Sequence, residues 1–154
     1  MDKIRRLLDE AIKQSTCHLI KLGVVIETPA SEYVLGWNGP PERCGPHNEC
    51  LVGGCITPEK IGECTGVHAE VRAICRAAER GIPIGGSTLY LSEWFCCAPC
   101  AIAMIEAGIS KLVLTEEINL DKDDCYHFKL AADLLEQSNV VIDIKKELHP
   151  RFKG

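Results

Sequence analysis

Two cysteines of this 154-residue chain have the residue type and spacing of metal ligands. Cys97 and Cys100 are three residues apart at the start of a predicted helix, so their side chains point in the same direction. The unpaired N–H groups of a helix start favour the thiolate, which is the form that binds a metal. Alone, the pair is equally consistent with a redox pair or with two buried small apolar side chains.

His68 and Glu70 add a second part to this pattern, at the start of another predicted helix. Histidine is a good third ligand for zinc, and three protein ligands leave the fourth position open for water, as in catalytic zinc sites. Positions i and i+2 lie about 200° apart around a helix, so both side chains share a pocket only if His68 lies at or just outside the first turn. The preceding Thr65 and Gly66 permit this. Glu70 is then the candidate general acid and base.

The elements that must position these residues follow from apolar periodicity and from turn residues. From residue 67 onward, helices and strands alternate, which implies parallel strands with crossover helices, while the first two strands form an antiparallel hairpin. The length predicts one domain over residues 1–154. The predicted helices cover residues 3–17, 67–80, 97–107 and 124–137, and the predicted strands cover residues 19–27, 33–37, 87–92, 111–115 and 140–145.

The helix predicted over residues 67–80 has an apolar face at helical spacing. This face consists of Val71, Ile74, Cys75 and Ala78. We expect it to be the buried face, with Cys75 packed as a small apolar side chain.

An insertion rich in cysteine, glycine and proline interrupts the regular order at about residues 40–66. A long irregular segment inside a compact domain is usually functional or held by something. Soft ligands in such a loop favour a second, structural zinc ion, although scattered cysteines with a solvent-exposed histidine are the alternative. The spacing does not select four ligands from the five candidates, which are Cys44, His47, Cys50, Cys55 and Cys64.

Composition and charge restrict the classes of partner. The net charge is -5 and the sequence pI is about 5.5, which disfavours a nucleic-acid partner. The sequence shows no signal peptide and no apolar run long enough to span a membrane, so we expect a cytoplasmic protein with no membrane partner. Thiols stay reduced in that compartment, which makes clustered cysteines better candidates for metal ligands than for disulfides.

Three segments resemble motifs of the cytidine/deoxycytidylate deaminase superfamily, and are most similar to its dCMP deaminase branch. Residues 67–74 (VHAEVRAI) resemble the first zinc motif, and residues 87–92 followed by 97–101 (CAPCA) resemble the second. Residues 36–40 (GWNGP) resemble the G-Y-N-G stretch of the dCMP branch. The resemblance covers roughly residues 3–145, and it implies a three-layer α/β/α sandwich with a central mixed five-stranded sheet.

The resemblance also implies a reaction, which is the zinc-dependent hydrolytic deamination of a free pyrimidine nucleotide, most simply dCMP to dUMP plus ammonia. The zinc ligands would be His68, Cys97 and Cys100, and Glu70 would move the protons between water, ring nitrogen and leaving ammonia. In the family, the backbone N–H of the residue matching Ala69 holds the base carbonyl.

Asn38 matches the asparagine that contacts the base or sugar in the family, and an amide suits that task because it can both donate and accept. The alternative is an ordinary turn residue before Gly39 and Pro40. A substrate phosphate would be expected near this loop, where Arg43 and Lys60 are the only cations of residues 40–66.

The sequence departs from the family beside the second motif. Cys96 occupies a position that is usually proline, which places three thiols close together. Cys97, and not Cys96, has the three-residue spacing to Cys100. Glu93, Trp94 and Phe95 also differ from the usual acidic-proline approach, so the substrate can differ from dCMP.

Two other functions remain open from the sequence. One is a deaminase of another small amino-substituted base or nucleoside, including a purine; RNA editing is disfavoured by the acidic charge. The other is a non-catalytic binding domain stabilised by zinc, against which Glu70 argues because it is not needed to hold the metal. Family members usually assemble, so we expect a homo-oligomer.

Overall fold

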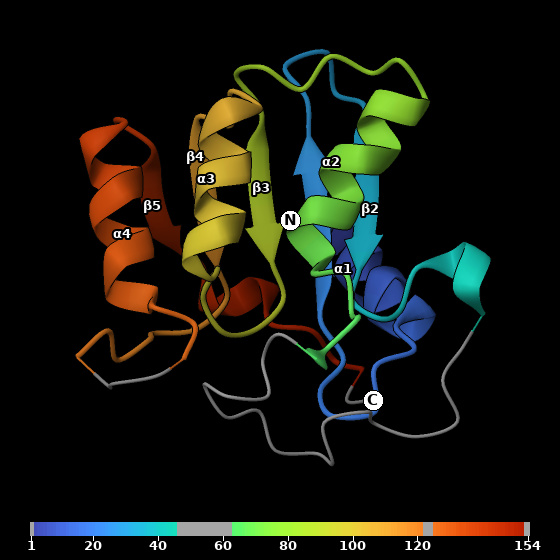
Figure 1. Cartoon of the computed structure of the whole chain (residues 1–154). Coiled ribbons are helices and arrows are strands. Elements are labelled where there is room, and N and C mark those ends of the chain that lie inside the picture. The colour runs from blue at the N-terminus through green and yellow to red at the C-terminus, as the bar shows by residue number, and fades with distance from the viewer. Residues whose placement is uncertain (1, 46–62, 122–124, 153–154) are drawn as a thin grey trace.

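The computed structural model of the protein describes residues 2–45, 63–121 and 125–152 (Figure 1). Within them it contains four α-helices and five strands, in agreement with the number and order predicted from the sequence. The helices are α1 (Asp2–Gln14), α2 (Ala69–Glu79), α3 (Ala98–Glu106) and α4 (Phe128–Gln137), and the strands are β1 (Gly23–Glu27), β2 (Tyr33–Trp37), β3 (Thr88–Leu91), β4 (Lys111–Leu114) and β5 (Val141–Ile144). Short 3-10 turns cover Glu42–Cys44 and Lys146–Leu148.

The five strands form one mixed sheet in the order β2-β1-β3-β4-β5. The strand β1 pairs antiparallel with both β2 and β3, whereas β3, β4 and β5 run parallel. This arrangement confirms the predicted hairpin and the predicted crossover connections. It also directs the carboxyl ends of β2, β3, β4 and β5 to the same end of the sheet.

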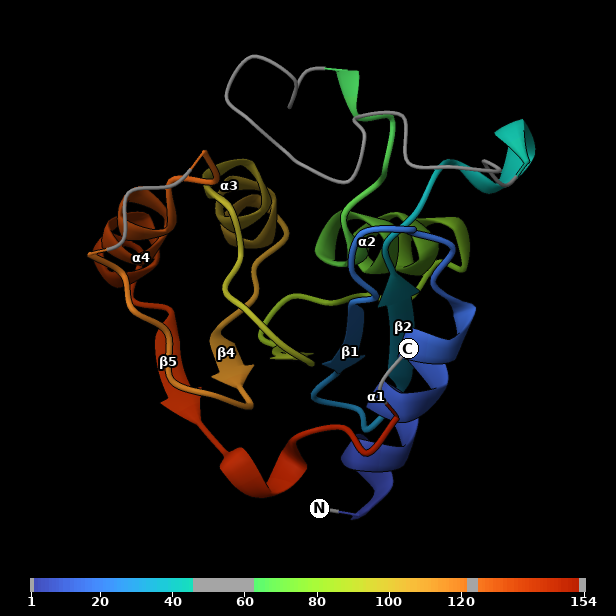
Figure 2. The ribbon, with the colours of Figure 1, turned by 90° about the horizontal axis from the view of Figure 1, so that it is seen from below.

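Helices cover both faces of the sheet, which confirms the three-layer architecture (Figure 2). Three helices, α2, α3 and α4, pack on one face, and α1 with the 3-10 turn at Lys146–Leu148 packs on the other. Alternate strand residues face the two layers: Leu89 and Leu91 belong to the core under α2 and α3, while Tyr90 packs toward α1.

The face of α2 that the sequence pattern predicts is only partly buried. Val71 and Ile74 are partly buried against the core, whereas Cys75 and Ala78 are exposed, and the fully buried side chains that face the sheet are Ala69, Ala73 and Ala77. The cause is the close approach of α2 to β2, where a Cβ on Gly36 would lie 2.2 Å from the carbonyl oxygen of Ala69. Only small residues fit at this distance, so the alanine stripe occupies the positions closest to the sheet.

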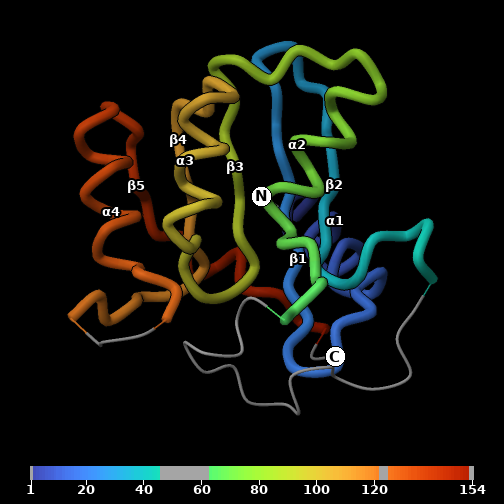
Figure 3. The backbone as a smooth tube through the Cα atoms, viewed as in Figure 1, coloured from blue at the N-terminus to red at the C-terminus, as the bar shows by residue number. Residues whose placement is uncertain are grey.

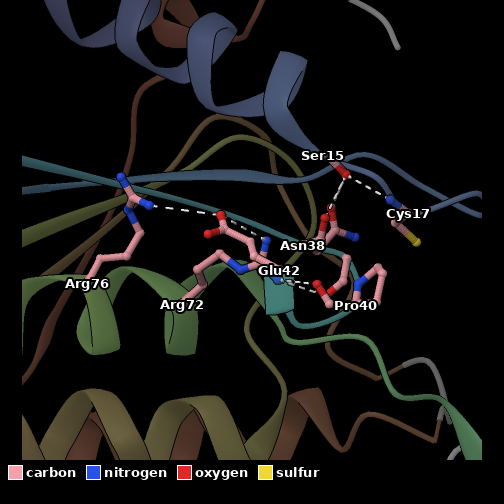
Figure 4. Close-up of polar contacts among 8 residues, drawn as sticks. Ser15, Cys17, Asn38, Pro40, Glu42, Arg72 and Arg76 are labelled. Carbon is pink, nitrogen blue, oxygen red and sulfur yellow. Dashed lines mark hydrogen bonds and ion pairs between the residues drawn. The ribbon is translucent and has the colours of Figure 1, made fainter. Parts of the chain in front are cut away.

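Residues 15–22 also differ from the prediction, because they form neither the end of the first helix nor the start of β1. Asn38, directly after β2, holds them with its side chain (Figure 4). Its Oδ1 accepts hydrogen bonds from Ser15 Oγ at 2.6 Å and from Leu22 N at 2.8 Å, and its Nδ2 donates to Ile20 O at 2.8 Å. These bonds satisfy backbone groups that a helix or strand would otherwise pair, so the segment forms a loop.

The starts of α2 and α3 lie at the same end of the sheet as the loop that Asn38 holds (Figure 3). This end combines carboxyl ends of strands with helix N-termini, which is where ligands bind in open α/β sheets. Of the helices that the structure describes, even the longest, α1 with 13 residues, is too short to cross a bilayer.

Candidate active site

His68 occupies the N-cap position of α2, with the extended backbone that the sequence argument requires. The preceding Val67 forms a two-bond antiparallel bridge with Gly39: Val67 N donates to Gly39 O at 2.7 Å, and Gly39 N donates to Val67 O at 3.2 Å. The bridge fixes the entry of the chain into α2. As a result, His68 lies just outside the helix, and Glu70 lies in its first turn on the same pocket.

Cys97 and Cys100 lie at the start of α3, where Cys97 is the N-cap and Pro99 occupies the first turn. The Nδ1 atom of His68 is 3.3 Å from the Sγ atoms of both cysteines. A tetrahedral zinc ion with a Zn–N bond of about 2.1 Å and Zn–S bonds of about 2.3 Å would hold nitrogen and sulfur about 3.6 Å apart. The three side chains therefore fit a zinc ion after a shift of a few tenths of an ångström.

The structure separates Cys97 from its neighbour Cys96. Among the described residues, one group of three or more potential ligands has its ligand atoms within 4.8 Å of one another, and it consists of His68, Cys97 and Cys100. Cys96 is fully buried in the apolar core, and burial raises the pKa of its thiol well above the usual range. A neutral thiol in the core is a poor metal ligand, which favours Cys97 in that role.

Shared hydrogen bonds link the protonation states of the three candidate ligands. A hydrogen bond from Cys100, aided by His68, lowers the pKa of the Cys97 thiol to about 4 against the opposing effect of burial. The same bond, together with burial, raises the pKa of Cys100, and the bond to Cys97 raises the pKa of His68. Ligand atoms that share protons in this way can release those protons when a divalent metal ion binds.

Glu70 is 4% exposed, and what remains accessible of it faces a pocket beside the three candidate ligands. Burial raises the pKa of its carboxyl group, because a charged carboxylate loses solvation there. We call this cavity the site pocket. The described residues that line it are Cys17, Leu19, Ile20, Leu22, Asn38, Gly39, Cys64, Gly66, Val67, His68, Ala69, Glu70, Trp94, Phe95, Cys97, Tyr126 and Phe128.

One wall of the site pocket is aromatic, and the sequence argument did not identify it as a binding surface. Tyr126 and Phe128 stack with ring centroids 5.6 Å apart, and Trp94 and Phe95 meet them edge-on at 5.8 and 5.9 Å. The backbone N–H of Trp94 donates to Glu116 Oε1 at 2.8 Å, which fixes the loop after β3. The available signal in the sequence was the pair of aromatic residues Tyr126 and Phe128 at the start of α4. Local periodicity does not encode the loops that bring this pair together with Trp94 and Phe95.

Asn38 and Ala69 both line the site pocket. The side-chain oxygen of Asn38 already accepts two hydrogen bonds from the protein, and Nδ2 donates one of its two N–H groups to Ile20 O. One N–H of the amide is left over from these bonds for a ligand. Ala69 is fully buried at the first position of α2, so its backbone N–H belongs to the unpaired donors of a helix start.

The candidates for a second metal site are divided between described and undescribed residues. Cys44 and Cys64 are both exposed, and neither belongs to the group of converging ligands. His47, Cys50 and Cys55 lie outside the described residues. A second zinc ion therefore stays a prediction from the sequence.

The chain is similar to known deaminases in sequence. Residues 2–116 match the model of the cytidine and deoxycytidylate deaminase zinc-binding region. The chain is 28% identical over 130 residues to ComE operon protein 2 of Bacillus subtilis, covering 84% of the chain and 62% of that protein. It is 26% identical over 124 residues to deoxycytidylate deaminase of Saccharomyces cerevisiae, covering 77% of the chain and 38% of that protein. The chain thus spans less than two thirds of the length of these curated relatives.

Solved structures share the fold. The dCMP deaminase from the cyanophage S-TIM5, in complex with dCMP and dUMP, superposes with a TM-score of 0.70 at 24% identity, over 93% of the chain and 94% of that structure. A diaminohydroxyphosphoribosylaminopyrimidine deaminase/reductase from Thermotoga maritima gives a TM-score of 0.62 at 15% identity, over 96% of the chain and 37% of that structure. At these identities the likeness supports the three-layer fold alone.

Proposed function

The chain belongs to the cytidine and deoxycytidylate deaminase zinc-binding family, and from this premise we propose that it is a zinc-dependent hydrolase that converts dCMP to dUMP and ammonia. The observation that carries the proposal is the convergence of His68, Cys97 and Cys100 beside the buried carboxyl group of Glu70. A structural zinc site would need a fourth protein ligand, and it would not need a buried acid facing a pocket.

His68, Cys97 and Cys100 would hold the zinc ion, which supplies a water activated as a nucleophile at neutral pH. Glu70 would accept one proton from the attacking water and transfer it to the ring nitrogen. It would then take the second proton from the hydroxyl group now bonded to the ring carbon and deliver it to the amino group, which leaves as ammonia when the C–N bond breaks. Its carboxyl group is neutral for part of this cycle, and the burial that raises its pKa stabilises that form. The N–H of Ala69 is oriented by α2 to bind the carbonyl group of the base.

The aromatic wall supports a planar substrate. A base that enters the site pocket would meet the rings of Trp94, Phe95, Tyr126 and Phe128, and apolar planar surfaces bind planar rings with little ordering cost. Asn38 lines the same pocket, and the second N–H of its amide would donate to a base or sugar oxygen.

A second candidate substrate is an uncharged nucleoside or another amino-substituted base. None of the described residues that line the site pocket is lysine or arginine. A monophosphate needs a cation or several backbone N–H groups, and the pocket lining offers it no described cation. The relatives named deoxycytidylate deaminase support the nucleotide, whereas the pocket lining supports the nucleoside.

An ammonia-release assay tests both candidates. The zinc-loaded protein is incubated with dCMP, deoxycytidine, cytidine, cytosine, adenosine and guanine, and bound zinc is counted per chain. Release from dCMP with little from deoxycytidine supports the nucleotide substrate, and the reverse supports the nucleoside. Zinc-loaded protein that releases ammonia from none of them would contradict deaminase activity on small substrates and favour a zinc-stabilised binding domain.

Three further properties are proposals from the sequence and the family. The protein is a single-domain homo-oligomer, it works in the reducing cytoplasm, and its insertion at residues 40–66 binds a second zinc ion. Sedimentation velocity measures the assembly. Two zinc ions per chain in the parent, with one left after Cys50 and Cys55 are both replaced by serine, would support the second site, and one ion in both proteins would contradict it.

A further inference from the structure

Arg72 is the most buried cation among the described residues, and its contacts lead to the candidate metal ligand His68 at the N-cap of α2. Its Nη2 atom donates to Gly39 O at 3.0 Å and to Pro40 O at 2.7 Å (Figure 4). The residue is 6% exposed. One guanidinium group therefore binds two consecutive carbonyl groups of the segment that follows β2.

This segment is the one that fixes the start of α2. Gly39 and Val67 exchange two backbone hydrogen bonds, and Val67 is adjacent to His68. On the other side of His68, its carbonyl oxygen accepts the first helical hydrogen bond from Arg72 N at 3.0 Å. His68 thus lies between the Gly39–Val67 bridge and the first turn of α2. Arg72 connects the two, because its backbone belongs to that helix and its side chain binds Gly39 O.

The surroundings of Arg72 make these hydrogen bonds strong. Among the described residues, the nearest carboxylate oxygen is Glu42 Oε1, 4.0 Å from Nη1, and the Trp37 ring centroid is 5.7 Å from the guanidinium carbon. Nη1 itself is buried and has no hydrogen-bond partner in the described part of the chain. In a desolvated site the carbonyl groups of Gly39 and Pro40 are therefore main partners of the charge, and charged hydrogen bonds gain strength there.

From this geometry we propose that Arg72 is a positioning residue that orients His68 for metal binding through the Gly39–Val67 bridge. The proposal rests on the proposed function only in taking His68 as a zinc ligand. It assigns Arg72 no contact with the substrate or with the metal.

Arg76 provides a matched control on the same helix. It lies one turn after Arg72, its guanidinium carbon is 4.6 Å from the Trp37 ring centroid, and its Nη1 is 4.0 Å from Glu42 Oε1. The hydrogen bonds to Gly39 O and Pro40 O come from Arg72 instead. A comparison of the two arginines therefore isolates the two carbonyl contacts from charge, helix propensity and stacking on Trp37.

The first readout is zinc affinity, measured by competition with a chromophoric chelator for the parent, Arg72→Met, Arg72→Lys, Arg76→Met and Arg76→Lys. Residues that orient a metal ligand typically change metal affinity by about 10–100-fold when replaced, and we expect this loss for Arg72→Met. Arg72→Lys keeps the charge but loses the planar fork, so we expect an intermediate loss. Both Arg76 variants should stay within about twofold of the parent, because Arg76 makes neither carbonyl contact and its 4.0 Å ion pair with the exposed Glu42 contributes little.

The second readout is hydrogen exchange of backbone amides in the zinc-free protein. In both Arg72 variants the amides of Gly39 and Val67 should exchange at least about tenfold faster than in the parent, while the amides of β3 and β4 keep their rates. A general loss of stability would accelerate all of these amides together. This readout does not depend on zinc or on any reaction.

The lysine variants keep the test decisive if Arg72→Met does not fold. Weaker zinc binding by Arg72→Lys than by Arg76→Lys, with faster exchange confined to Gly39 and Val67, supports the proposal. Equal zinc affinity in the two lysine variants overturns it, as does uniform acceleration of exchange. If the parent releases no ammonia but these differences persist, the proposed function fails while the role of Arg72 stands.

Discussion

Two glutamates lie on opposite sides of the sheet, and their carboxyl groups differ in their hydrogen bonding and burial. On the α1 face, Glu27 accepts hydrogen bonds from Tyr33 at 3.0 Å and from Tyr90 at 2.8 Å, one on each carboxylate oxygen. On the α2 face, Glu70 is buried at a helix start and borders the site pocket. The first carboxylate is satisfied within the protein, whereas the second is kept desolvated beside candidate metal ligands.

The difference between the two glutamates shows which side of the sheet holds the reactive groups. On the α1 face, strand residues meet one another across the pleated surface, and their polar groups pair locally. On the α2 face, reactive groups project from the ends of elements, where two helix starts and several loops converge. Changes on the α2 face should therefore affect zinc binding and turnover, and changes on the α1 face should affect stability alone.

The largest effect is expected from removal of a candidate ligand. Cys100→Ala should bind zinc too weakly for retention on a desalting column and should show no ammonia release above background, because two ligands do not make a stable site. Cys96→Ala removes a buried thiol next to the site and should keep one zinc ion and at least half of the activity. Loss of zinc in Cys96→Ala with retention in a Cys97→Ala variant would reverse the ligand assignment.

Removal of the candidate acid and base should separate turnover from metal binding. Glu70→Gln should keep zinc and fold, and should lower kcat by about 10²–10⁴-fold, which is the usual contribution of a positioned acid or base. Glu79→Gln, at the exposed end of α2, serves as the control and should match the parent. Parental turnover in Glu70→Gln would refute the proposed role of this carboxyl group.

Because β2 and α2 are in close contact, a substitution in β2 should displace the start of α2 and weaken zinc binding. In Gly36→Ala the new Cβ would lie 2.2 Å from Ala69 O and 2.7 Å from Ala73 N, so the start of α2 must move. We expect a loss of about 1–3 kcal/mol of stability together with weaker zinc binding. Gly85→Ala introduces a Cβ with no atom of the described residues within 4 Å of it and should leave both properties unchanged.

Thermal melting and zinc titration measure these effects in both glycine variants. If Gly36→Ala lost stability but bound zinc with parental affinity, the start of α2 would be independent of the contact with β2. The proposed path from the sheet to His68 would then be wrong.

The smallest effect is expected on the α1 face. Tyr90→Phe removes one hydrogen bond to Glu27, which should cost about 1 kcal/mol and lower Tm by about 2–4 °C. The hydrogen bond from Tyr33 to Glu27 remains. Zinc affinity and ammonia release should equal those of the parent. A fall in kcat of more than about threefold, with zinc retained, would show that the two faces are coupled and would break the comparison.

The sequence alone determined the order of the elements and the members of the candidate metal group. Periods of two and 3.6 residues are local properties, so the five strands, the four helices and the mixed sheet could be predicted from them. The candidate ligands follow from the two motifs and their resemblance to the family's zinc motifs. The structure brings His68, Cys97 and Cys100 together because they occupy helix starts, which gather at one end of such a sheet. The three-residue spacing also separated Cys97 from Cys96.

Only the tertiary structure decided how these elements meet. The periodicity of α2 predicted a buried face whose Val71 and Ile74 do pack against the core, but the close approach at Gly36 places the alanine stripe directly against the sheet and leaves Cys75 exposed. Residues 15–22 left their predicted helix and strand because Asn38 binds their polar groups. Arg72 gave no local signal, since its partners are carbonyl groups more than thirty residues away. Such contacts depend on distances between elements, and no local pattern of residue types encodes those distances.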